Sequence, residues 1–505
     1  RTGISSPVYA ALAFDPTMPL YADDGSYNLT SIKGLGTLGV NPYARLTELN
    51  LDRESSLVSL NGYVDYKILD GLNVNLTAGT RMRFNSDRRF DAELNNPNRA
   101  SINDSDSKSN QATLRLTYEK EIRDHRFKID GIYELQSSKW HENSILGVDV
   151  TYPSTTYNNI GTATDITVSS YASEQKIESL MGRVNYTFMN RYVFSGAVRR
   201  DGASVLAEGN KYDVFPSGAL AWRVSEENFM KDSNIFESLK IRASYGLTGN
   251  QAIGPYESLS VLATGPTENY PFDDTTAVIG AGPSRIANPD LRWEKTQQVD
   301  VGLDASFLNG RLNFVFDYYK KKTKDLLLSV PLAAYRGGLE FTDNIGDVEN
   351  TGYEVGISGR IVNTDVFVWD CNFNIGFNET IVANLGDNEE FFAGGRFGDG
   401  QAIAPAVILQ VGEKTGNFWG LIYDGVWKSS EVEEAALFGN VPGDAKYQDI
   451  NGDNTINNDD LAVMGNGQPD YIWGLNNTFS YKNFDLNVFF QAVHGNEIWN
   501  LGRGY

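Results

Sequence analysis

The sequence is short of the residues that build disulfides, metal centres and membrane helices. Its 505 residues include one cysteine, Cys371, and three histidines. A single cysteine excludes an internal disulfide and a cysteine-based zinc site. No stretch approaches the apolar length that a membrane-spanning helix needs, and the mean hydropathy of -0.35 is too low for a bundle of such helices. Any membrane role would therefore come through strands.

Positive charge is also scarce. The chain carries 43 basic and 65 acidic residues, a net charge of -22. A field of that sign repels phosphate backbones, so we expect no nucleic-acid partner. The first residues, "RTGISSPVYA", show no charged-then-apolar leader, so we expect no secretion signal within this chain.

Alternating hairpins recur along the whole chain. In residues 297–321, "QQVDVGLDASFLNGRLNFVFDYYKK", apolar side chains alternate with polar ones on both sides of the pair Asn309-Gly310. This is the pattern of two antiparallel strands joined by a tight turn, with one apolar face and one polar face. Similar hairpins turn at Asp70-Gly71, near Asp124, and at Met189-Asn190, Asn363-Thr364 and Lys482-Asn483.

Between the tight turns the sequence predicts long polar loops, at 87–107, 141–174, 251–292, 327–350 and 383–470. Short turns at one end and long loops at the other are typical of outer-membrane barrels, with the short turns in the periplasm. Aromatic residues at strand ends, Trp293, Tyr318, Tyr319, Trp473, Tyr481 and Phe484, suit an interfacial girdle. We expect an all-β fold, a transmembrane antiparallel up-and-down β-barrel, with about fourteen wall strands between Arg53 and Ile498 and one more near residues 4–13. Alternation alone also fits a soluble all-β protein.

Several segments of the sequence resemble those of one protein family. They include "NRYVFSGAVRRDGAS", "FPSGALAWRVSEENFMK", "NPDLRWEKTQQVDVGLD", "NIGDVENTGYEVGI" and "PGDAKYQDINGDNTINNDDLAVMGN". In this order they are similar to the barrel of SusC/RagA-type TonB-dependent transporters. The resemblance implies a 22-stranded outer-membrane barrel with an N-terminal plug, a SusD-like lipoprotein partner, and import of an oligosaccharide or peptide with energy relayed by the TonB complex.

Compared with members of that family, residues 1–505 resemble a single barrel region. We expect an incomplete barrel wall, without the plug, the signal sequence and the C-terminal strands. Contact with the TonB complex would belong to the missing N-terminal region. The expected location is the outer membrane of a Gram-negative, Bacteroidetes-like cell. Two alternatives remain open: a passive porin-like channel, and a soluble secreted glycan-binding β protein.

The segment "DINGDNTINNDD", residues 449–460, has the spacing of a calcium loop within the 383–470 excursion. Oxygen ligands fall at positions 1, 3, 5, 7, 9 and 12: Asp449, Asn451, Asp453, the Thr455 carbonyl, Asn457 and Asp460. Asn454 stands where glycine is usual, and asparagine tolerates the left-handed backbone better than most residues. We expect a structural Ca²⁺ site, against the alternative of an acidic solvated turn.

The same excursion contains Trp419, Tyr423 and Trp427, whose rings could stack on sugars, so we predict substrate contacts there. Elsewhere the three histidines lie in separate hairpins, and the chain has no G-x-S-x-G nucleophile and no phosphate-binding lysine loop. We therefore expect no enzyme activity and no organic cofactor.

Overall fold

The computed structural model describes residues 11, 14, 18–28, 41–47, 49–92, 97–230, 235–264, 268–271, 277–278, 280–331, 340–393 and 407–498. One antiparallel sheet of fourteen strands dominates this part of the chain. The strand expected near residues 4–13 falls almost entirely outside the described residues. No helix of the described part is long and apolar enough to cross a membrane.

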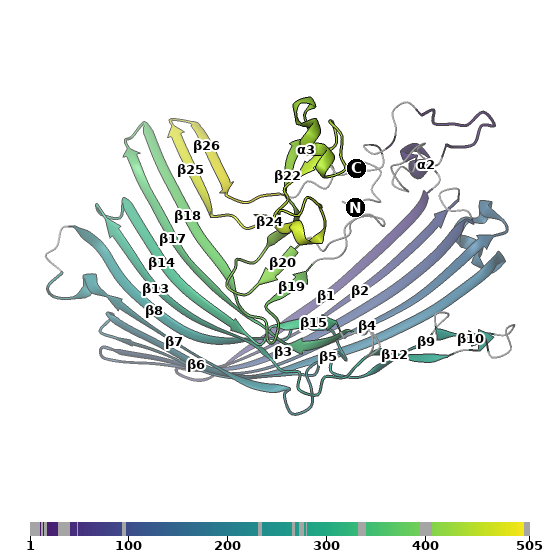
Figure 1. Cartoon of the computed structure of the whole chain (residues 1–505). Coiled ribbons are helices and arrows are strands. Elements are labelled where there is room, and N and C mark those ends of the chain that lie inside the picture. Colours follow the sequence, from purple (N-terminus) through teal and green to yellow (C-terminus); the bar gives the residue numbers. More distant parts are fainter. Residues whose placement is uncertain are drawn as a thin grey trace.

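The wall strands pair in chain order, each with its neighbour in sequence. They are β1 (Leu49–Leu69), β2 (Leu72–Asp91), β3 (Arg99–Ile122), β4 (His125–Val150), β5 (Ala163–Phe188), β6 (Tyr192–Ala203), β7 (Tyr212–Arg223), β8 (Phe236–Asn250), β13 (Glu294–Phe307), β14 (Leu312–Lys324), β17 (Asp347–Asn363), β18 (Phe367–Asn384), β25 (Tyr471–Tyr481) and β26 (Phe484–His494). The sheet curves into an open trough with β1 and β26 as its edges (Figure 1). The prediction of fourteen strands in an up-and-down order is confirmed.

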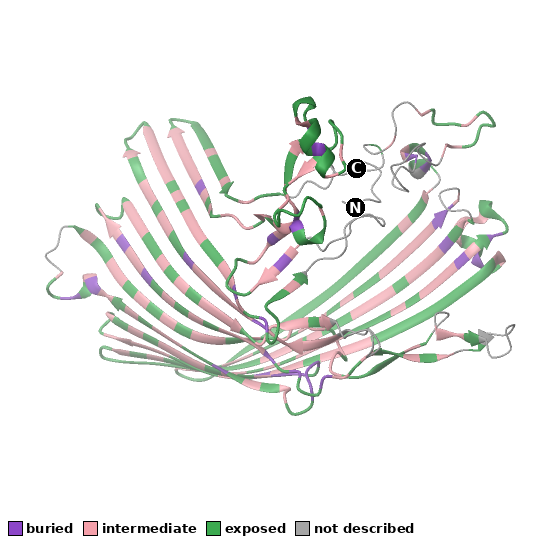
Figure 2. Ribbon diagram, in the orientation of Figure 1, coloured by how far each residue is buried: buried purple, intermediate pink, exposed green. Residues whose placement is uncertain are grey.

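Cross-strand register sorts the side chains into two faces. Val64, Leu76, Leu114, Tyr133 and Leu180 stand opposite one another in turn across β1 to β5, and we call the side that they share the apolar face. All five side chains are exposed, as the banding along the strands in Figure 2 illustrates. No second sheet covers these residues in the described part of the chain, so their partner is a medium outside the protein.

The opposite side, the polar face, is built by the residues between those rows. Lys67, Asn73, Thr117, Asp130 and Arg183 stand opposite one another in turn across the same five strands. Since side chains alternate along a strand, one wall can meet lipid and water at once.

The short turns lie where the sequence predicted them. β1 and β2 are separated only by Asp70-Gly71, β3 and β4 by Arg123-Asp124, and β25 and β26 by Lys482-Asn483. One connection at this end is longer than expected, because residues 224–235 join β7 to β8 and include the 3-10 helix η3 (Val224–Glu226).

Two of the predicted long loops were also wrong. β2 and β3 continue through most of 87–107, leaving a connection of 92–98, and β4 and β5 continue through most of 141–174, leaving 151–162 with the 3-10 helix η2 (Pro153–Thr162). These polar stretches lack the apolar alternation of a membrane strand. Their pairing is held by backbone hydrogen bonds, which do not depend on side-chain polarity.

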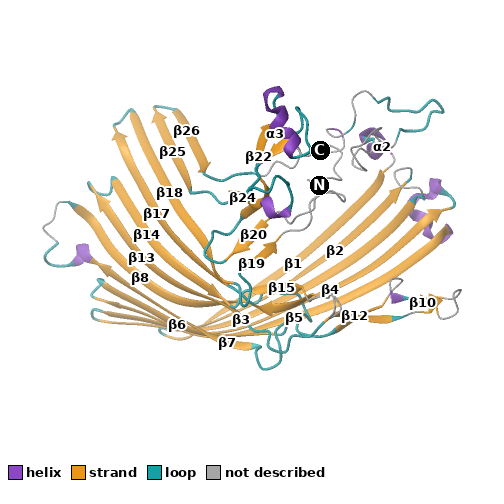
Figure 3. Ribbon diagram, in the orientation of Figure 1, coloured by secondary structure: helices purple, strands orange, loops and turns teal. Residues whose placement is uncertain are grey.

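The other long connections carry small elements of their own, drawn with the wall in Figure 3. Between β8 and β13 lie β9 (Val261–Thr264), β10 (Tyr270–Pro271), β11 (Ala277–Val278) and β12 (Ala281–Arg285); between β14 and β17 lie β15 (Leu327–Pro331) and β16 (Glu340–Asn344). Between β18 and β25 lie β19 (Glu390–Ala393), β20 (Val407–Gln410), β21 (Asn417–Leu421), β22 (Tyr423–Val426), the 3-10 helix η6 (Ser429–Glu431), α3 (Val432–Leu437), β23 (Ala445–Tyr447), the 3-10 helix η7 (Asn458–Asp460) and β24 (Leu461–Asn466). A short helix, α2 (Pro42–Thr47), precedes β1.

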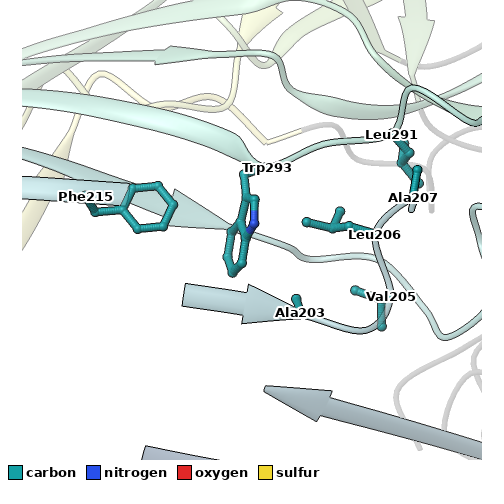
Figure 4. Close-up of a cluster of buried hydrophobic side chains, with 7 residues drawn as sticks. All are labelled: Ala203, Val205, Leu206, Ala207, Phe215, Leu291 and Trp293. Carbon is teal, nitrogen blue, oxygen red and sulfur yellow. The ribbon is translucent and has the colours of Figure 1, made fainter. Parts of the chain in front are cut away.

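Trp293 does not belong to an aromatic girdle. It is 3% exposed and packs edge-on against Phe215, with ring centroids 5.4 Å apart, in a cluster with Leu206 and Leu291 (Figure 4). Its indole Nε1 donates a hydrogen bond to the Lys211 carbonyl at 3.0 Å. This cluster fastens the connection between β6 and β7 to the segment that enters β13.

The two faces predict opposite responses to the same charge. Val301→Lys places an ammonium group on the apolar face, and we expect it to lower the free energy of unfolding in a bilayer by about 2–4 kcal/mol. Ser244→Lys, on the polar face of the neighbouring strand and opposite Asp300, is the matched control and should change it little. Equilibrium unfolding of the full-length protein in lipid vesicles measures both. Equal losses for the two variants would contradict the assignment of faces.

Candidate functional site

The polar face carries a charge network across three adjacent strands. Arg242 on β8 lies between Asp304 on β13 and Asp317 on β14, with its Nη2 3.1 Å from Asp304 Oδ1 and 2.7 Å from Asp317 Oδ2. Lys240 Nζ lies 3.1 Å from the other oxygen of Asp304. Gly302 leaves room for this arrangement, because a Cβ atom there would collide with the Arg242 guanidinium group. The face is thus lined by fixed, mutually neutralised charges.

A hollow of about 620 Å³ lies where the connections after β8 and β14 meet β5. Tyr171, Tyr256 and Phe341 line it, together with Glu257 and Arg285. The backbone N–H of Glu174 donates to the Tyr256 hydroxyl at 3.2 Å, which ties the loop to the upper part of β5. Aromatic rings beside a few fixed polar groups are the usual composition of a small-molecule site.

The polar groups of this hollow are held in place. Arg285 Nη1 lies 3.1 Å from Glu257 Oε1, and its Nη2 donates to the Tyr256 carbonyl at 2.7 Å. Thr342 Oγ1 donates to the other oxygen of Glu257 at 3.0 Å. A pre-positioned carboxylate and guanidinium group can bind the hydroxyls of a sugar or the termini and side chains of a peptide.

The excursion between β18 and β25 folds into two small sheets. One has the order β19-β20-β21-β24, and the other pairs β22 with β23. The Lys414 side chain contacts Glu379 of β18 at 3.2 Å, and the Asn466 amide donates to the Thr415 carbonyl at 3.0 Å. In the structure β18 ends at Asn384 and β25 begins at Tyr471, so the connection between these two wall strands is 385–470.

The three aromatic residues predicted to contact substrate occupy different environments. Trp419 on β21 is half-buried near Phe392, with centroids 6.2 Å apart, and Tyr423 on β22 is 61% exposed. Trp427 is only 5% exposed and packs against Phe438 and under the Lys446 ammonium group. Its burial leaves Trp427 unavailable for stacking in this conformation, and the structure does not bring the three rings together on one surface.

Residues 449–460 form a compact polar loop. Asp449 Oδ1 accepts from the Gly452 N–H at 2.7 Å and its Oδ2 from the Asn454 N–H at 2.8 Å, while Asp453 Oδ1 accepts from the Thr455 N–H at 2.7 Å. Asn454 has a φ of +59°, the left-handed geometry expected at that position. In the described part of the chain no three carboxylate, imidazole or thiol side chains are grouped closely enough to hold a metal ion.

Asp460 closes this loop from its interior. Its side chain is fully buried, and it accepts the Asn457 N–H at 2.9 Å and the Ile450 N–H at 2.8 Å. The bond from Asn457, helped by that from Ile450, holds the pKa of the Asp460 carboxyl below its ordinary value, although burial acts in the opposite direction. Of the predicted asparagine ligands, Asn451 accepts the Asp453 N–H at 2.9 Å and Asn457 accepts the Asp459 N–H at 2.6 Å. The predicted ligands thus hold the loop through backbone bonds.

A wall with one exposed apolar face, a charged polar face and structured connections at one end defines an outer-membrane β-barrel. A family model described as "TonB dependent receptor-like, beta-barrel" matches residues 7–501. TonB-dependent receptor P3 of Formosa agariphila is 36% identical over 521 residues, covering 100% of this chain and 51% of the relative. TonB-dependent receptor SusC of Bacteroides thetaiotaomicron is 33% identical over 339 residues, covering 66% and 32%.

A solved structure of the RagAB peptide transporter shares the fold, with a TM-score of 0.77 and 19% identity over 94% of this chain and 51% of that one. The chain therefore belongs to the TonB-dependent receptor β-barrel family, and the expected location in the outer membrane is confirmed. It spans about half the length of the curated relatives that match along nearly all of it.

None of the sequence patterns singled out a residue of the 620 Å³ hollow. Tyr256, Glu257 and Arg285 lie in the predicted long loop 251–292, but no pattern set them apart within it. Tyr171 lay in a segment taken for a loop, although it is a residue of β5. Only the extended register of β4 and β5 places it beside Tyr256.

Arg242 is the test of the charge network. Arg242→Met removes the cation that Asp304 and Asp317 share and leaves Lys240 paired with Asp304 alone, and we expect it to lower the free energy of unfolding by about 1–3 kcal/mol. Adding Asp304→Asn and Asp317→Asn removes the repulsion and should restore much of the loss. Thermal or denaturant unfolding of the full-length receptor measures both, and an additive loss in the triple variant would contradict the network.

Proposed function

We propose that this chain forms wall and outer loops of a TonB-dependent receptor that imports a nutrient, an oligosaccharide or a peptide, together with a SusD-like surface lipoprotein. Membership of the TonB-dependent receptor family carries this proposal. The relative named SusC and the fold shared with a peptide transporter support it. Energy would reach the receptor through the TonB complex, by way of a segment that precedes the barrel.

The two alternatives differ in what they require of the wall. A soluble glycan-binding protein would bury its apolar rows, whereas Leu180 and the rest of its row are exposed. A passive porin shares the lipid-exposed wall, so only energy dependence separates it from an importer. We also propose that the chain has no enzyme activity, since its relatives are named as receptors and its fixed polar groups suit binding.

Substrate contact is proposed first for the hollow lined by Tyr171, Tyr256 and Phe341. Its rings offer faces for a sugar or an apolar side chain, while Glu257 and Arg285 offer charged hydrogen bonds. In the excursion 385–470, Tyr423 and Trp419 remain proposed contacts, because the Tyr423 ring is exposed and the Trp419 ring is half-exposed. Trp427 is buried and packs against Phe438.

Uptake by the full-length receptor tests the proposal. A host strain lacking the receptor, complemented with the intact gene, should regain growth on one of a panel of oligosaccharides and peptides, and a protonophore should abolish the uptake of that labelled substrate. Tyr171→Ala with Phe341→Ala should lower uptake about tenfold, roughly the loss of one good contact. Tyr152→Ala, an exposed tyrosine outside the hollow, should not. Uptake that survives the protonophore would favour the passive channel.

A second proposal concerns residues 449–460. We propose that this loop binds Ca²⁺ as a structural clamp, through Asp449, Asn451, Asp453, the Thr455 carbonyl, Asn457 and Asp460. Support comes from the ligand spacing, the left-handed Asn454 and the buried Asp460 carboxylate at the closing position. To bind the ion, the Asp449 and Asp453 carboxylates would have to give up hydrogen bonds that they accept from backbone N–H groups. The ion would then link the two ends of the loop and would have no catalytic role.

Calcium should stabilise the receptor against heat, because an ion bound by the folded loop alone shifts the unfolding equilibrium. Millimolar Ca²⁺ added after chelation should raise the melting temperature or slow proteolysis within 385–470, while Mg²⁺ should do neither. Asp449→Asn with Asp453→Asn should abolish the response, and Asp459→Asn, outside the ligand pattern, should keep it. An unchanged response in the double variant would end the proposal.

A further inference from the structure

A second hollow, of about 640 Å³, lies on the wall itself. One side is the row from Ala78 on β2 to Tyr212 on β7, and the other is the row from Asn110 on β3 to Ser204 after β6. Both rows belong to the apolar face, because Ala112 and Asn110 lie two and four residues from Leu114 on the same strand. Between them runs one polar-face row that also lines the hollow, with Gly79, Gln111, Gln136, Ile177, Ala203 and Lys211. The polar-face rows on either side, through Thr113 and Ser109, do not line it, so the hollow opens on the side of the wall that meets lipid.

Small residues make this hollow, and its polar end is already satisfied. Ala78 and Ala112 occupy positions where the next row towards the tight turns carries Leu76 and Leu114, and Gly202 lets the Tyr212 ring lie over its backbone. The Glu178 carboxylate accepts the Tyr133 hydroxyl at 2.7 Å and the Tyr212 hydroxyl at 2.9 Å. A ligand therefore meets an apolar groove beside hydroxyl groups, without a free carboxylate at its base.

Lysines gather on the same face at the upper border of the hollow. Lys108 stands directly opposite Lys139 in the ladder, an arrangement of like charges that destabilises a sheet unless an anion relieves it. Lys139 and Lys176 share one partner, Glu174, at 3.6 and 3.2 Å, and Lys108 has no ion pair in the described part of the chain. Arg200 lies 4.1 Å over the Tyr212 ring.

This cationic group contrasts with the chain that carries it. The whole chain has a net charge of -22, yet on this stretch of the apolar face four cations, Lys108, Lys139, Lys176 and Arg200, stand beside two carboxylates, Glu174 and Glu178. In the next row above, Asp106 faces His141 at 3.3 Å and does not reach the lysines through any ion pair that the structure records. The local excess of positive charge favours an anionic occupant.

The height of these lysines along the wall strands shows which layer of the membrane surrounds them. From Ile122, beside a tight turn, the strand rises to Asn110 through roughly 29–33 Å along the membrane normal, at the usual rise and tilt of a barrel strand. That distance is somewhat more than the height of the apolar band, about 25 Å. Since tight turns face the periplasm, Lys108, Lys139 and Lys176 lie at the headgroup layer of the outer leaflet.

We propose that this hollow, with Lys108, Lys139 and Lys176, binds a phosphate-bearing glycolipid of the outer leaflet. Its phosphate groups pair with the ammonium groups, its sugar hydroxyls meet Asn110, Ser137 and Tyr212, and an acyl chain lies in the groove over Ala112. The site is on the opposite face from the charge network of Arg242, so the inference does not depend on what the receptor imports.

Binding of lipid A to the purified, delipidated full-length receptor tests the site. Titration with diphosphorylated lipid A, followed by native mass spectrometry, should show one retained lipid, and Lys108→Gln with Lys139→Gln should weaken that binding about tenfold or more, at roughly fivefold per lysine near a charged lipid surface. The matched control is Lys320→Gln with Lys322→Gln, two lysines of the same face that are both paired with Glu349. This control should leave the affinity unchanged.

Further measurements distinguish binding of the whole glycolipid from binding of its phosphate groups alone. Ala112→Leu fills the groove without changing charge and should weaken lipid A binding several-fold, while dephosphorylated lipid A should bind the unsubstituted receptor no better than phosphatidylethanolamine does. Inorganic phosphate at equal concentration should not compete. Equal affinity for lipid A in the two double-lysine variants, or full competition by inorganic phosphate, would overturn the proposal. If the lysine variants do not fold, the Ala112→Leu variant decides, and undiminished binding of lipid A by that variant would also overturn the proposal.

Discussion

Within hydrocarbon, no water is present to bond to exposed backbone amides and carbonyls, so a polypeptide wall must satisfy them by itself. The fourteen-stranded ladder meets that requirement between each pair of neighbouring strands from β1 to β26, and the outer edges of these two strands have no partner strand in the described part of the chain. Once the ladder exists, the alternation of side chains produces two chemically different faces. The exposed row through Leu180 and the network around Arg242 are two results of the same constraint.

This constraint also determines how much could be predicted from sequence. Strand number, order and most tight turns followed from apolar alternation and from turn residues such as Asp70-Gly71. The family was inferred from sequence segments along the whole chain that resemble those of known members. Prediction failed above the membrane, where β4 and β5 continue as paired strands through polar sequence, because both faces of a strand meet water there and alternation disappears.

The candidate sites show the same limit. Within the 383–470 excursion the burial of Trp427 could not be predicted, since it depends on Phe438 and Lys446 folding back over the ring. Trp293 was taken for a lipid-facing residue for a similar reason. Its burial arises from Phe215 and Leu206, which are distant in sequence and are brought together only by the order of the strands.

The unequal lengths of the wall strands have a consequence for the shape of the mouth. β3, β4 and β5 have 24, 26 and 26 residues, whereas β6 and β7 have 12 each and β14 has 13. On one flank the sheet therefore rises well beyond the bilayer, and on the neighbouring flank it ends near the headgroups. A flat surface laid across these strand ends would therefore meet β3, β4 and β5 before it reached β6 and β7.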